Sequence, residues 1–141
     1  QVTSGITAAL RGRNADQTVL SFQEVVSSLG RIGEQPLGIQ EIPLDRVVGS
    51  VDKVRDFDPG FRPRSGRSRE RWERLDEAVR RGRPLPPIDV YQVGDLYFVR
   101  DGHHRVSVLR ALRMPTIEAD VTRVFTMLDP AGVSGLADLV R

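Results

Sequence analysis

Residues 88–99 read Ile-Asp-Val-Tyr-Gln-Val-Gly-Asp-Leu-Tyr-Phe-Val, two runs of β-branched and aromatic residues around Gly94-Asp95. Such runs around a turn pair predict a β-hairpin, with strands over Ile88–Gln92 and Leu96–Val99. The four residues before it, Pro84–Pro87, prevent a helix from continuing into the hairpin. This segment therefore requires a sheet in the fold.

Two other segments alternate between apolar and polar residues, as half-buried strands do. They are Ile39–Ile42 and Ile117–Thr122. The stretch Arg31–Gly38, with two glycines and a proline, predicts a linker. Residues 43–49 are expected to turn away from the first strand, and Ser50–Arg67, rich in Asp, Arg, Pro and Gly, to form a long ordered loop.

Four helices are expected. The first runs from a cap at Asp16 to about Leu29, with Ser21 and Glu24 as a capping pair and Gly30 as its end. The second has its cap at Ser68 and ends at Gly82. The other two cover His103–Leu112 and the residues after Asp129, where Pro130 suits a first helical position.

Length and composition fit one compact α+β domain. The chain has 141 residues, of which 39% are hydrophobic and 28% charged. It contains no cysteine, which excludes a disulfide framework, a thiol nucleophile and a cysteine zinc site. No apolar run has the length of a membrane span, so no membrane partner is predicted and a cytoplasmic location is expected.

The residues Asp101-Gly102-His103-His104-Arg105 stand between a predicted strand and a predicted helix. A helix N-terminus carries partial positive charge, so cations are unfavourable there unless something negative lies beside them. Free backbone N–H groups, the helix dipole and an arginine together form an anion site, for which phosphate is the most common ligand. The competing structural interpretation is that the imidazoles pack in the core and Arg105 pairs with Asp101 or Asp89.

Three segments in order resemble the ParB/sulfiredoxin superfamily N-terminal domain, also described as the ParB-like nuclease domain. These segments are "IQEIPLDRVV", "AVRRGRPLPPIDVYQVGDLYFV" and "RDGHHRVSVLRALRMPTIEADV". The resemblance implies a small mixed sheet with packed helices, to which this chain adds an N-terminal helix. It implies three regions: an N-terminal helical arm over 1–36, the ParB/sulfiredoxin-like domain over 37–126, and a C-terminal helix over 127–141.

The branches of this superfamily differ at the glycine-containing turn. Sulfiredoxins carry a reactive cysteine where this chain has His103, which excludes sulfinate repair. Partitioning ParB proteins carry G-E-R-R, which binds the phosphates of CTP, and Gly102 and Arg105 match its first and last residues. Free-serine kinases carry D-G-H-x-R, which Asp101, Gly102, His103 and Arg105 match.

The leading functional prediction is a ParB-like domain that binds a nucleotide (ATP, ADP or CTP) or another phosphate ligand, in which Asp101 could also hold Mg²⁺. The predicted phosphate-binding residues are Asp101, Gly102, His103, His104 and Arg105. One alternative is a nucleotide-dependent small-molecule kinase or nucleotide hydrolase, with Asp52, Asp56, Asp58 and His103 as catalytic candidates. The other is a DNA-associated module or nuclease.

Arginines between the loop and the second helix could contact phosphate as well. The stretch from Arg62 to Arg67 contains no acidic residue, so Arg62, Arg64 and Arg67 are the secondary candidates for phosphate or non-specific DNA contact. The later arginines alternate with acids at helical spacing, which favours a salt-bridged helix. The resemblance also leaves a homodimer open as a prediction.

Overall fold

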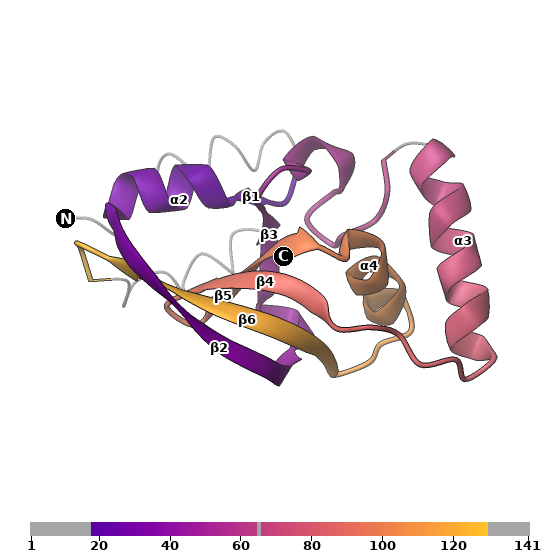
Figure 1. Ribbon diagram of the computed structural model, residues 1–141. Helices are drawn as coiled ribbons and strands as arrows, with labels where there is room; N and C mark the ends of the chain where they lie inside the picture. The colour runs from indigo at the N-terminus through magenta and orange to yellow at the C-terminus, as the bar shows by residue number, and fades with distance from the viewer. Residues whose placement is uncertain (1–17, 65, 130–141) are drawn as a thin grey trace.

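The structure is a computed structural model that describes residues 18–64 and 66–129, with the backbone alone for 66–68. Helices are interspersed among the strands along the described chain (Figure 1). The strands are β1 (Leu20–Ser21), β2 (Arg31–Pro43), β3 (Val47–Ser50), β4 (Ile88–Val93), β5 (Leu96–Asp101) and β6 (Thr116–Thr126). The α-helices are α2 (Phe22–Leu29), α3 (Gly66–Arg80) and α4 (His103–Ala111), and short 3₁₀ turns cover Leu44–Arg46 and Val54–Asp56.

The six strands form one mixed sheet in the order β1-β3-β5-β4-β6-β2. The β4–β5 hairpin is antiparallel and lies in its centre, as the sequence predicts. β3 runs parallel to β5, β6 runs parallel to β4, and β2 closes the far edge antiparallel to β6. The predicted α+β class and the added N-terminal helix are therefore confirmed.

Alternating side chains of the strands supply two hydrophobic clusters, one on each face of the sheet. Along β5, Leu96 and Phe98 join the cluster with α2, whereas Tyr97 and Val99 join the cluster with α4. Figure 1 shows α2 at the left of the sheet and α4, then α3, at the right. The long loop after β3 covers the α4 face through the fully buried Phe57 and Phe61.

Helix α2 begins at Phe22 and not after Asp16, because Leu20 and Ser21 form β1 beside β3. The Oγ of Ser21 accepts a hydrogen bond from the backbone N–H of Glu24, so the predicted capping contact is present. Gly30 ends the helix at φ 78°, a backbone conformation that glycine adopts without steric cost.

Three other boundary predictions are wrong. The predicted linker Arg31–Gly38 belongs to β2 and pairs with β6, with register shifts that accommodate its glycines and Pro36. Val47–Gly49, expected to turn away, forms most of β3. Helix α3 begins at Gly66, so Ser68 lies inside it and does not cap it.

Residues 1–17 of the predicted N-terminal arm, which include Asp16, and the residues after Asp129 that are predicted to form a helix lie outside the described residues. Within the described part of the chain, none of the helices combines the length and apolar character that crossing a bilayer requires.

Candidate functional site: the N-terminus of α4

Gly102 joins β5 to α4 in a conformation that favours glycine. Its φ is 108°, and none of the described side chains caps the N-terminus of α4 that follows. A Cβ at this position would collide with the side chain of Ile88, whose own Cβ would lie 2.8 Å away. The close approach of β4 and the positive φ therefore both require glycine, and the first turn of α4 is left uncapped.

Arg105 is held across this turn by backbone and side-chain acceptors. Its Nη1 donates to the carbonyls of Pro86 and Pro87 at 2.8 and 3.0 Å. Its Nη2 pairs with Asp101 at 3.2 Å. Asp101 is one of the two partners, Asp101 or Asp89, that the structural interpretation leaves open. The guanidinium is thus fixed at the start of α4, and a single exposed carboxylate opposes its charge.

His103 points into the core. It is 3% exposed, its ring stacks on Phe57 at 5.5 Å, and its Nε2 lies 2.7 Å from the Oγ of Ser50. Ser50 already accepts from the backbone N–H of Lys53, so we assign its hydroxyl proton to the bond with Nε2. Burial, and next the nearby charge of Lys53, lower the pKa of His103 to about 4. His103 is therefore neutral at pH 7 and links β3 to α4.

His104 is buried in a different environment. It is 8% exposed and meets Phe57 edge to face at 5.3 Å. Burial, and next the charge of Arg71, lower the pKa of His104. Among the described residues, its buried Nε2 has no hydrogen-bond partner. A buried polar atom without a partner costs free energy, which favours a ligand or water beside this ring.

A cavity of about 160 Å³ opens at this N-terminus. The residues that line it come from the loop after β3, from α3 and from the Asp101–Arg105 turn. They are Lys53, Arg71, Leu75, Asp101, Gly102, His103, His104 and Arg105. The fold thus brings together all five predicted phosphate-binding residues and adds two cations, Lys53 and Arg71. Sequence reasoning missed both cations, and also Ser50, because they are distant along the chain.

The three aspartates predicted as catalytic candidates lie in the loop after β3 and do not line this cavity. Asp58 accepts from the backbone N–H groups of Gly60 and Arg62, both at 2.9 Å, and so shapes its own turn. Asp52 and Asp56 are exposed. In residues 18–64 and 66–129, no group of three His, Asp or Glu side chains is placed to hold a metal ion, and Asp101 contacts Arg105.

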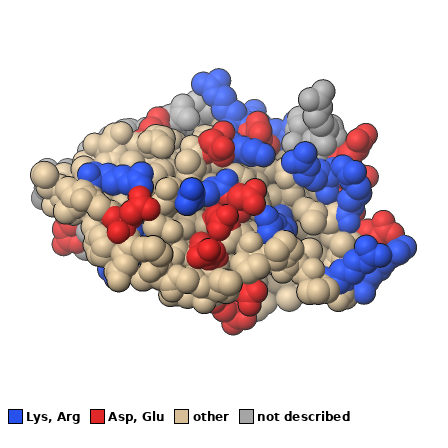
Figure 2. Space-filling model, in the orientation of Figure 1, with Lys and Arg blue, Asp and Glu red and all other residues tan. Residues whose placement is uncertain are grey.

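The secondary arginine candidates separate in the structure. Arg62 lines a different cavity, between α3 and α4, and Arg64 is exposed and lines neither cavity. Arg67 is described by its backbone alone. Basic side chains gather with acidic ones around α3 (Figure 2). Two ion pairs within α3 are the i,i+4 contacts expected of a salt-bridged helix: Arg80 pairs with Asp76, and Arg81 pairs with Glu77.

The solved structures that are similar to this chain include a sulfiredoxin and a chromosome-partitioning protein. Sulfiredoxin from Arabidopsis thaliana is 22% identical with a TM-score of 0.44, and the likeness covers 73% of this chain and 97% of that one. The C-terminally truncated chromosome-partitioning protein ParB from Caulobacter crescentus, complexed with CTP-gamma-S, is 22% identical with a TM-score of 0.45. That likeness covers 71% of this chain and 50% of that one.

No curated relative matches the sequence. The family model of the ParB N-terminal domain matches residues 34–131, which span the described sheet from β2 to β6 and helices α3 and α4. The chain therefore belongs to the ParB N-terminal domain family.

Proposed function

We propose that this domain binds a phosphate-bearing ligand, a nucleotide in the first instance, with the phosphate at the N-terminus of α4. The observation that supports this most strongly is the uncapped first turn of α4 facing a cavity with three basic side chains, Lys53, Arg71 and Arg105. Backbone N–H groups, the helix dipole and basic side chains all favour an anion at this point.

The size of the cavity indicates which part of the ligand it holds. About 160 Å³ is below the range of about 300–1,000 Å³ typical of pockets that enclose a drug-sized molecule. The cavity therefore takes the phosphate end, and the rest of the ligand extends from it. His104 lies at the wall of this cavity, and a ligand or an ordered water would supply the partner that its Nε2 lacks among the described residues.

Calorimetric titration with CTP and ATP, with inorganic pyrophosphate as a minimal phosphate probe, tests the proposal. The ParB protein from Caulobacter crescentus was solved with CTP-gamma-S, which makes CTP the first nucleotide to test. The informative variant is Arg71→Gln, because Arg71 is exposed and lines the cavity. Its matched control is Arg74→Gln, an exposed arginine of the same helix that lines neither cavity.

We expect Arg71→Gln to weaken binding of the phosphate probe about tenfold, the effect of losing one charge-assisted hydrogen bond of about 1.5 kcal/mol. Arg74→Gln should bind as the wild type does. Absence of binding by CTP, ATP and pyrophosphate at millimolar concentration would overturn the proposal. Equal weakening by both variants would also overturn it, since it would indicate a general charge effect.

A further inference from the structure

A second, larger cavity lies between α3, α4 and the loop after β3, with a volume of about 380 Å³. Its lining is basic and aromatic, and no acidic residue of the described chain lines it. The lining residues are Gly60, Arg62, Pro63, Arg69, Trp72, Ser107, Arg110 and Ala111. This volume falls in the range of pockets that enclose small molecules, so the cavity can hold a whole ligand.

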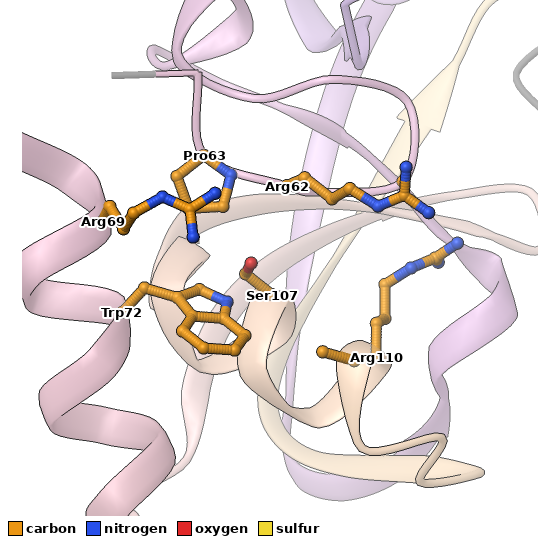
Figure 3. A pocket seen from close by; sticks show the side chains of 8 residues that line it. Arg62, Pro63, Arg69, Trp72, Ser107 and Arg110 are labelled. Atoms are coloured by element: carbon orange, nitrogen blue, oxygen red, sulfur yellow. The ribbon is translucent and has the colours of Figure 1, made fainter. Parts of the chain in front are cut away.

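The two ends of the cavity differ in chemistry. Figure 3 shows the indole of Trp72 at one side, with Arg69 and Pro63 next to it. At the other side the guanidinium groups of Arg62 and Arg110 point the same way, and the Ser107 hydroxyl lies between the two ends. Trp72 is only partly buried, so its ring is available as a stacking surface.

Arg110 is anchored in place by the fold. Its Nη1 donates to the carbonyl of Leu44 at 3.0 Å, which ties α4 to the turn before β3. Arg62 differs, because in the described part of the chain it forms no ion pair with a carboxylate. The guanidinium of Arg62 is therefore available to pair with an anionic group at this end of the cavity.

Hydrogen bonds and core packing fix the conformation of the loop after β3 at Arg62. The Oδ1 of Asp58 accepts from the backbone N–H of Arg62, and the backbone N–H of Phe61 donates to the Asp58 carbonyl at 2.8 Å. Phe61 has a φ of 62°, which is rare for a bulky residue and costs free energy, and its fully buried ring packs near Phe57. Core packing thus holds this turn in one conformation, with Arg62 over the cavity.

We propose that this cavity binds a small anion that carries a planar ring, with the ring on the indole of Trp72 and the anionic group at Arg62. The site is separate from the N-terminus of α4 and does not depend on the function proposed there. Stacking and a charge-assisted hydrogen bond at opposite ends select ligands that have both groups, such as a nucleoside monophosphate or an aromatic carboxylate.

Trp72 is the only tryptophan of the chain, so its fluorescence reports on this cavity directly. The probes are AMP, which has ring and phosphate, and nicotinate, which has ring and carboxylate. Two further compounds serve as controls. Adenosine lacks the negative charge, and ribose 5-phosphate lacks the planar ring. We expect saturable quenching by AMP, by nicotinate or by both, which identifies the preferred anion. Adenosine and ribose 5-phosphate should bind at least about tenfold more weakly than AMP, since each loses one of the two contacts.

Variants separate the two sites. Arg62→Gln should weaken the binding of the quenching probe about tenfold, while Arg64→Gln, an exposed arginine of the same loop outside both cavities, should leave it unchanged. Arg71→Gln should also leave it unchanged. No saturable quenching by AMP or nicotinate, ribose 5-phosphate binding as tightly as AMP, or equal weakening by Arg64→Gln or Arg71→Gln would each overturn the proposal.

Discussion

His103 joins β3 to α4 through a bond that depends on its being neutral. The Ser50 hydroxyl donates to its Nε2 only while that nitrogen carries no proton, and protonation would place a charge beside Phe57 in the core. The pKa of this histidine is about 4 in the folded chain against 6.5 for an ordinary histidine. Between pH 4 and pH 6.5, the unfolded chain therefore binds a proton at His103 more readily than the folded chain does.

This pKa difference predicts how stability changes with pH. As pH falls from 6.5 to 4, the free energy of unfolding should decrease by about 3 kcal/mol through His103 alone, because the unfolded state takes up the proton first. Urea unfolding of the wild type and of His103→Gln, each at pH 7 and pH 4, measures this contribution.

The glutamine variant is the control because it keeps a polar group near Ser50 and cannot titrate. Its loss of stability over the same pH range should be smaller than that of the wild type by about 3 kcal/mol. If the free energy of unfolding of both proteins falls by the same amount, His103 has an ordinary pKa, and the buried Ser50–His103 bond does not restrict its protonation.

The sequence predicts some residues of the site and not others for a simple reason. Residues 101–105 are contiguous, and their position between a strand and a helix is visible in the pattern alone. Lys53, Arg71 and Ser50 reach the same site from other elements, and only the pairing of β3 with β5 and the contact of α3 with α4 bring them there. No local signal marks Lys53 and Arg71 among the 21 lysines and arginines of the chain.

At the scale of elements, β2 shows that glycine and proline residues do not always mark a linker. Gly33, Pro36 and Gly38 are typical of a linker, yet they lie in a thirteen-residue strand. Among the described strands, β2 lies at the edge of the sheet and has a partner on one side only, so it tolerates a proline and the register shifts beside it. The hairpin was predictable because β4 and β5 are consecutive, whereas the pairing of β2 with β6 depends on the whole topology.

Helix α3 is attached differently from the other two helices. Its apolar residues Trp72, Leu75, Ala78 and Val79 are all only partly buried. None of its described residues belongs to either hydrophobic cluster, and it contacts α4 from outside the main core. Residues of α3 line both cavities, so any movement of this helix would change access to them.

Hydrogen exchange should show this weaker attachment. Because few buried apolar contacts hold α3, its interior amides should open locally and exchange at least about tenfold faster than those of β5. Exchange followed by NMR or mass spectrometry at pH 7 compares the two elements in one sample. Protection of α3 equal to that of β5 would contradict the prediction and show that α3 unfolds only with the entire domain.

For the whole molecule, the sheet separates a face covered by α2 from a face that carries both cavities. Helix α2 covers one side, where Phe22 stacks on Tyr91 at 4.7 Å and meets Phe98 edge to face at 5.7 Å. The other side carries α4, the loop after β3 and both cavities. There Phe57 contacts the rings of His103 and His104 and so supports the N-terminus of α4. Stability depends on both faces, and binding is expected to depend on one.

Matched substitutions of these two phenylalanines test this division. Phe22 and Phe57 are both fully buried, so Phe22→Leu and Phe57→Leu should each lower the free energy of unfolding by about 1–2 kcal/mol. Only Phe57→Leu should weaken pyrophosphate binding, by about three- to tenfold, because the His104 ring loses the surface that positions it. Urea unfolding and calorimetry on the same samples measure both effects. Equal weakening of binding by the two variants would mean that affinity follows overall stability, and that the two faces are not functionally separate.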